Sequence, residues 1–185
     1  MSSIRLLLAA LLSLAPALTP ASGPVTLVAC APGYPGTTAE AQPSLDALSA
    51  ALAEAAGWPR DALHAEYQQS EKGGLDRLGK ADAALAMVPL PFFLKHEKAL
   101  RLEPRLLVQS EGGSLLEPWS LVAGKGRVGS PAALEGFTVS SLAGYAPDFV
   151  RGAPGGWGRI PDSAQVAFSG QVLTGLRKAA QGEKV

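Results

Sequence analysis

The residues of this 185-residue chain that could carry out chemistry are few and widely spaced. Cys30 is the only cysteine, so the chain cannot form an internal disulfide or a cysteine-rich zinc site. His64 and His96 are the only histidines, and they lie too far apart in the sequence to indicate a metal cluster. Ser140-Ser141 has no histidine near it, which argues against a serine–histidine–aspartate triad. We therefore expect no enzymatic activity, no metal and no cofactor.

Charge and glycine patterns argue against two further kinds of function. The 16 basic and 16 acidic side chains balance, whereas a nucleic-acid-binding protein usually carries a basic excess. Gly124-Lys125-Gly126 lacks the spacing of a phosphate-binding loop, so we interpret it as a hairpin turn. The carboxylates of Glu71, Asp76 and Asp82 flank short elements, and we expect them to be solvated.

Three loops at the ends of predicted strands are the remaining candidates for a ligand site: residues 31–36, 89–92 and 140–145. Ligands of open α/β sheets bind beyond the carboxyl ends of the strands. Each loop also precedes the start of a predicted helix, whose free N–H groups favour an anion. The alternative is that these residues only shape turns. The hydroxyl donors in the loops are Tyr34, Ser140, Ser141 and Tyr145.

The elements that must position these loops are expected to alternate along the first half of the chain. Apolar runs and turn residues predict strands over 25–30 and 63–67, and helices over 43–56 and 72–78. Pro43 suits a first helical turn, and the helix that it begins is expected to bury Leu45, Leu48 and Leu52.

An unbroken apolar run over 83–88 is typical of a strand covered on both faces, as in parallel sheets. A short helix is expected through 92–94, and further strands over 105–109 and 119–123. This alternation of strands and helices predicts an α/β fold.

A second segment begins near Trp119. A helical turn is expected over 131–134, a strand over 137–140, the start of a helix over 147–150 and a loop over 152–158. A strand over 165–168 and a helix over 170–180 should follow, with Val172, Leu173 and Leu176 on the inner side of the helix. Such a helix normally leads into another strand, so we expect the second segment to be truncated.

The first 21 residues have the pattern of a signal peptide. A short segment with Arg5 precedes an apolar run over 6–18, which is shorter than the roughly 20 residues that span a bilayer. The mature chain is then expected to begin near Ser22 and to be periplasmic or extracellular. Leu27-Val28-Ala29-Cys30 has the look of a lipoprotein box, which would anchor the chain to a membrane, but it is also read as a buried strand in which the cysteine packs as a small hydrophobe.

The order of several motifs resembles a known family. Residues 75–83 (LDRLGKADA) resemble the L-x-x-G-x-x-D-(apolar) segment of type 2 periplasmic solute-binding proteins. Residues 87–92 (MVPLPF) are similar to a Gly-Pro-Leu-Pro-Tyr stretch in the phosphate/phosphite/phosphonate-binding components of ABC transporters. Residues 134–139 (LEGFTV) resemble the start of the second lobe in that family, and 168–171 (FSGQ) a later strand–helix unit. The resemblance covers nearly all of residues 25–185.

The resemblance implies a two-lobed, type 2 periplasmic-binding-protein-like α/β fold, with lobes over 24–117 and 119–185, that closes on a ligand. Where the family usually has Ser-Thr-Ser-Gly, this chain has residues 140–145 (SSLAGY), so only two hydroxyls are kept. By position, the ligand-facing residues implied are Tyr34, Pro89, Leu90, Pro91, Phe92, Ser120, Ser140, Ser141, Gly144 and Tyr145.

The function implied is capture of a small, phosphate- or phosphonate-like anion by an exported protein that delivers it to an ABC permease. The altered serine run and the lipoprotein-like Cys30 motivate an alternative, which is a sensory or surface-attached binding domain outside transport. In both interpretations the partner is a small molecule that is bound without chemical change.

Overall fold

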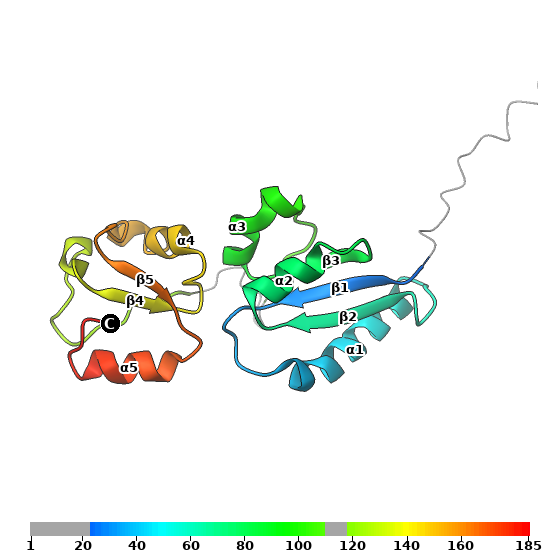
Figure 1. Ribbon diagram of the computed structural model, residues 1–185, viewed down its shortest axis with the longest axis horizontal. Coiled ribbons are helices and arrows are strands. Elements are labelled where there is room, and N and C mark those ends of the chain that lie inside the picture. The colour runs from blue at the N-terminus through cyan, green and yellow to red at the C-terminus, as the bar shows by residue number, and fades with distance from the viewer. Residues whose placement is uncertain (1–22, 110–117) are drawn as a thin grey trace, which may run out of the picture.

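Two small parallel sheets, one in each half of the chain, organise the structure (Figure 1). The computed structural model describes residues 23–109 and 118–185, which we call the N-terminal unit and the C-terminal unit. The predicted mixed α/β class is confirmed. The expected signal peptide over 1–21 lies outside the described residues.

The N-terminal unit alternates strands and helices as the sequence predicted. Its elements are β1 (Val25–Cys30), α1 (Thr38–Ala55), β2 (Leu63–Gln68), α2 (Glu71–Leu78), β3 (Ala83–Met87) and α3 (Leu90–Leu100). The strand order is β2-β1-β3, with β1 parallel to both neighbours. Since parallel strands share one direction, their carboxyl ends and the loops that follow lie at one edge of the sheet.

The two faces of β1 are covered by different helices. Leu27 and Ala29 pack with Leu45 and Ala53 of α1 in one hydrophobic core. The opposite face places Cys30 under α2, where a Cβ added to Gly74 would lie 2.1 Å from the Cys30 sulfur. Only glycine allows α2 to approach this closely, so the position of α2 over the sheet depends on Gly74.

Helix α1 begins five residues earlier than the predicted start at Pro43, because Thr37 caps it. The Thr37 hydroxyl accepts a hydrogen bond from the Glu40 backbone N–H, and the Glu40 carboxylate accepts one from the Thr37 N–H. This capping box satisfies free donors of the first turn and outweighs the signal of a proline that then lies inside the helix. The predicted inner face was partly wrong: Leu45 is buried, but Leu48 and Leu52 are exposed.

An ion-pair network ties α2 to β2 and to the amino ends of β1 and β3. Arg77 Nε donates to Glu66 Oε2 (2.7 Å), and Arg77 Nη2 donates to Asp82 Oδ2 (2.6 Å) and to the Thr26 hydroxyl (2.8 Å). Hydrogen bonds from Arg77 and then Thr26 lower the pKa of Asp82 to about 2. Asp82 was predicted to be merely solvated, whereas it holds these elements together at the sheet edge opposite the loops that follow the strands.

Three expectations for the middle of the chain were wrong. β3 is an edge strand rather than a strand covered on both faces, and Leu85 and Met87 are 42% and 37% exposed. Residues 105–109 and 119–123 form no strand, although their apolar patterns predicted one. A strand requires a partner as well as a pattern, and within residues 23–109 and 118–185 no strand pairs with either segment.

The C-terminal unit contains η1 (Pro131–Leu134), β4 (Thr138–Ser141), α4 (Pro147–Gly152), η2 (Gly155–Trp157), β5 (Gln165–Phe168) and α5 (Val172–Ala180). β4 and β5 are parallel, and a core around Phe137, Val139 and Ile160 holds the unit together. The loop predicted over 152–158 contains the short helix η2. The predicted inner side of α5 was wrong, since Val172, Leu173 and Leu176 are exposed and Ala179 is the buried residue.

Within residues 23–109 and 118–185, no helix combines the length and the apolar character needed to cross a membrane.

Candidate functional site

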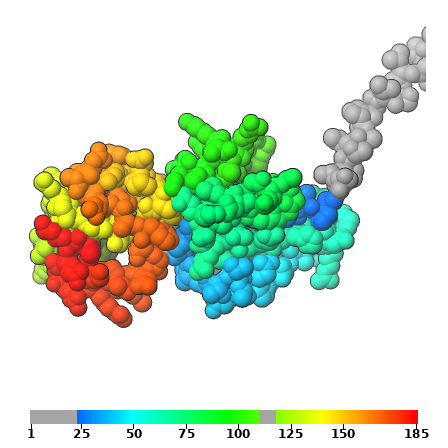
Figure 2. Space-filling view, viewed as in Figure 1, coloured from blue at the N-terminus to red at the C-terminus, as the bar shows by residue number. Residues whose placement is uncertain are grey.

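The loops that follow the strands of both sheets meet between the two units. Figure 2 shows the atoms of the two units in contact. Gly33 lies in the loop after β1, and a Cβ added there would lie 2.8 Å from the Phe168 ring at the end of β5. The same atom would lie 3.3 Å from Leu142, which follows β4. Gly33 has a φ of +82°, so it supplies both the left-handed turn and the space for this approach.

A cavity of about 540 Å³ lies at this meeting point. It combines hydroxyl and amide side chains with the rings of Tyr34 and Phe168, and none of its lining side chains carries a charge. The lining residues are Gly33, Tyr34, Pro35, Thr38, Gln68, Gln69, Ser70, Phe168 and Gly170. Both units contribute, so a solute bound here would touch both.

Beside this cavity a charged cluster joins the units. Lys95 Nζ on α3 donates to Glu71 Oε1 (2.5 Å) and to the backbone carbonyl oxygen of Tyr145 (2.5 Å) in the C-terminal unit. His96 Nε2 lies 2.8 Å from the same Glu71 oxygen. The Lys95 ammonium is also 5.8 Å from the centroid of the Tyr145 ring, and that ring packs edge-to-face on Phe168 with centroids 6.2 Å apart. The cluster therefore links the first turn of α2 to the loop after β4.

The electrostatics of the cluster favour an ionised Glu71 carboxylate, a protonated Cys30 thiol and a protonated Tyr145 phenol. Burial alone would raise the pKa of Glu71, but hydrogen bonds from Lys95 and His96 outweigh it and hold that pKa below its usual value. Burial, followed by the charge of Glu71, raises the pKa of the Cys30 thiol to about 12. Burial and the negative charge that Cys30, Glu71 and Tyr34 would carry raise the pKa of Tyr145. At neutral pH, Glu71 is thus the negative group of this site.

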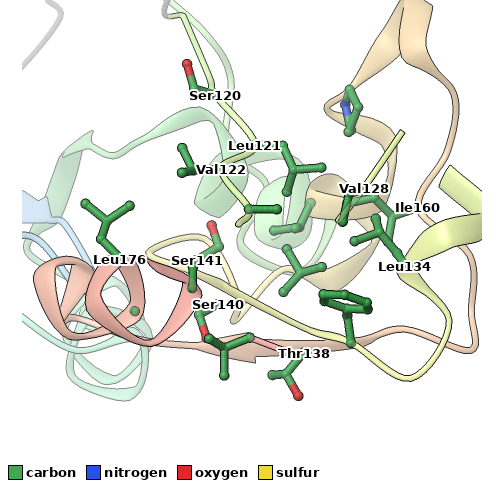
Figure 3. Close-up of a pocket in the computed structure, with 18 of the residues that line it drawn as sticks. Ser120, Leu121, Val122, Val128, Leu134, Thr138, Ser140, Ser141, Ile160 and Leu176 are labelled. Atoms are coloured by element: carbon green, nitrogen blue, oxygen red, sulfur yellow. The ribbon is translucent and has the colours of Figure 1, made fainter. Parts of the chain in front are cut away.

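A larger cavity, of about 670 Å³, lies inside the C-terminal unit (Figure 3). Its walls come from the segment around Ser120, from β4 and from the side of α5 that carries Leu176. Most of these walls are apolar. They include Val172 and Leu176 of α5, which the sequence predicted to be buried but which are exposed to this space. We interpret it as incompletely filled space between α5 and β4, since a single unit builds it, whereas both units build the smaller cavity.

The predicted site residues are divided between these places. Tyr34 lines the cavity between the units, and Tyr145 stands beside it against Phe168. Ser120, Ser140 and Ser141 line the larger cavity within the C-terminal unit. The structure therefore brings the two tyrosines together but not the serines with them.

The other predicted residues serve the fold of their own unit. Pro89 precedes α3 as its N-cap, Leu90 is exposed, and Pro91 and Phe92 are buried. A Cβ on Gly144 would lie 2.3 Å from the Ala167 carbonyl oxygen, so this glycine lets the loop after β4 pack closely on β5.

Sequence reasoning missed Lys95, His96 and Phe168 as site residues and assigned Glu71 to solubility. Lys95 and Tyr145 are 50 residues apart in the chain, and only the packing of α3 against the C-terminal unit brings them together. The sequence held a weak indication that Glu71 belongs to the site: it directly follows Ser70, the N-cap of α2, and so lies at the carboxyl end of β2 with the other strand-end loops.

The described part of the chain contains no group of three or more histidine, cysteine, aspartate or glutamate side chains that could hold a metal ion.

No protein-family model, curated protein or solved structure matches this chain.

Proposed function

We propose that this chain is an exported solute-binding protein that captures a small molecule between two α/β lobes, as a type 2 periplasmic binding protein does, and presents it to an ABC permease. The lobes of the proposal are the N-terminal and C-terminal units. Ligand would favour the closed form, because only that form contacts it from both sides.

The observation that carries the proposal is the cavity between Tyr34 and Phe168, at the carboxyl ends of both parallel sheets. Binding sites favour this edge of an open α/β sheet and the interfaces between units. The two units have separate hydrophobic cores, which is what a hinged pair requires. Small phosphate- or phosphonate-like anions, implied by the motif order, belong among the solutes to be tried.

Isothermal titration of the full chain against phosphate, phosphite, methylphosphonate and a set of small neutral and cationic solutes tests the proposal. We expect saturable heat at one site per chain for one chemical class, with a smaller radius of gyration in small-angle X-ray scattering when the ligand is bound. Absence of binding across the whole set, or binding without compaction, would contradict it.

The alternative is a sensory or surface-attached binding domain that uses the same cleft outside transport. The favouring observation is that Ser140 and Ser141, the hydroxyls kept from the resemblance, do not line the cavity between the units. Adjacent genes for a permease and an ATPase would favour transport, and a neighbouring receptor or kinase gene would favour sensing.

Export and anchoring are tested by the mass of the secreted chain. We expect cleavage after residue 21. Acylation at Cys30 would remove residues 1–29, and with them most of β1, the central strand in which Cys30 is fully buried. A diacylglyceryl mass on Cys30 would therefore contradict the fold described above as well as the proposed cleavage site.

A further inference from the structure

The Lys95 ammonium occupies a site that both units build. Lysine has three donors, and here two of them meet the Glu71 carboxylate and the Tyr145 carbonyl oxygen, each at 2.5 Å. The Tyr145 ring lies 5.8 Å away, within the range of a cation–π interaction. The side chains of Lys95 and Glu71 are 37% and 26% exposed, so solvent and small solutes can reach them. A carboxylate, a carbonyl and an aromatic ring are together the chemistry that recognises an ammonium group.

The same region is poorly suited to an anion. Glu71 lies in the first turn of α2, and the Ser70 hydroxyl already accepts the hydrogen bond of the Gly73 N–H. The amino end of α1 is occupied by the Thr37 and Glu40 side chains. Helix α3 begins after Pro89 and has Pro91 in its first turn, where proline has no N–H to donate. The three helix ends that follow the N-terminal sheet therefore offer few free donors.

The neighbouring cavity suits the uncharged body of a ligand. Its rings, hydroxyls and amides carry no formal charge, and Phe168 connects it to Tyr145 through the packing of the two rings. A ligand that reached from this cavity to Glu71 would need a positive end to replace the ion pair that Lys95 now makes.

Building on the proposed function, we propose that the solute is a small primary amine whose ammonium group takes the place that the Lys95 ammonium holds in this structure. Lys95 is then a tethered competitor. It bridges the two units by pairing with Glu71 and Tyr145, and its flexible stem lets it leave when ligand arrives. Because the binding-competent state is the one in which Lys95 has swung away, the observed affinity is reduced by the population of that state.

Removing the tethered competitor should strengthen amine binding. We expect Lys95→Ala to bind n-propylammonium about tenfold more tightly than the unmodified chain, since it no longer needs to displace its own lysine. Glu71→Gln should abolish this binding. Glu71→Asp keeps the negative charge but places the carboxylate farther from the bound ammonium group, so it should weaken the binding. Lys98→Ala removes the same charge from an exposed position of α3 and should leave the affinity unchanged.

Titration calorimetry of the full-length variants with n-propylammonium chloride, n-propanol and inorganic phosphate gives the readout, with circular dichroism to confirm folding. Amine binding that is tightened by Lys95→Ala and lost in Glu71→Gln supports the inference, and n-propanol should not bind. Phosphate binding that is lost in Lys95→Ala overturns the amine assignment while leaving the solute-binding function intact. Amine binding that is unaffected by Glu71→Gln overturns the assigned site. If neither the amine nor phosphate binds, and no other solute of the wider set gives binding heat, both proposals are overturned.

Discussion

Two aspartates only six positions apart, Asp76 and Asp82, have different roles in this chain. Asp76 lies within α2 and Asp82 follows that helix; the Asp76 pair with Lys72 is solvent-exposed, whereas Asp82 binds the Arg77 guanidinium, which is only 13% exposed. Exposed ion pairs contribute little to stability because water and salt screen them. A guanidinium held by two carboxylates and a hydroxyl instead fixes the positions of three elements.

The pH dependence of stability at acidic pH should follow the ionisation of the Asp82 carboxyl group. Its folded pKa, about 2, lies below the ordinary value of 3.8, so its stabilising contribution is present above about pH 4 and is lost as pH falls towards 2. We expect Asp82→Asn to lower the melting temperature at pH 7 and to lose this difference from the unmodified chain near pH 2. Thermal melts across this pH range measure it, with Asp76→Asn as the matched control. Equal effects of the two variants at pH 7 would contradict the structural role of the network.

At the scale of elements, helix α1 shows how a cap sets a boundary. The Thr37–Glu40 capping box starts the helix before Pro43, and this extra length brings Gln42 over β2, where its amide donates to the Ala65 carbonyl oxygen (2.7 Å). The shift also explains the buried face. Ser49 and Ala53 are small enough to let α1 lie close against the sheet, and the larger Leu48 and Leu52 turn outward.

Loss of the Thr37 cap should destabilise the N-terminal unit. We expect Thr37→Ala to lower the free energy of unfolding by about 1 kcal/mol, because a free N–H of the first turn loses its acceptor. In a chain of this size that corresponds to a fall of about 2–4 °C in melting temperature. Thr37→Ser keeps the hydroxyl and should restore most of the loss in thermal melts. A Thr37→Ser variant as unstable as Thr37→Ala would show that the methyl group, not the cap, matters.

At the scale of the whole molecule, a few contacts set the distance between the two units. Gly33 meets Phe168 and Leu142 across the interface, and Lys95 meets Tyr145 beside them. Each unit keeps its own core, and under the proposed function these contacts would open while both cores stay intact. The proposed function requires this interface to open and close around a solute.

A side chain at Gly33 should act as a wedge between the units. We expect Gly33→Val to increase the radius of gyration in small-angle X-ray scattering, because its side chain would occupy the space of the Phe168 ring. Gly36→Val introduces a similar backbone strain at φ +100°, but a Cβ there meets only Glu40 at 3.9 Å, so it should leave the dimensions unchanged. Adding Phe168→Ala to Gly33→Val should restore compactness. Equal expansion in both valine variants would assign the effect to loop strain instead.

Local patterns in the sequence predicted most of the helices and strands correctly, but they predicted less well which face of each element is buried. Strands over 25–30, 63–67 and 165–168 were predicted correctly because alternation, apolar runs and turn residues act over neighbouring positions. The same local reasoning failed at 105–109 and 119–123, where an apolar pattern has no partner strand among the residues that the structure describes. It also failed at β3, whose burial depends on its place at the edge of the sheet.

The sequence by itself determined the α/β class, the strand-end loops and the two tyrosines, Tyr34 and Tyr145, that come together between the units. Only the tertiary structure decided that Lys95, Glu71 and Tyr145 form one cluster and that the serines line a different cavity. The physical reason is that charge pairing and ring packing depend on distances of a few ångströms between residues far apart in the chain. Those distances are set by how helices pack on sheets, not by the pattern of any one segment.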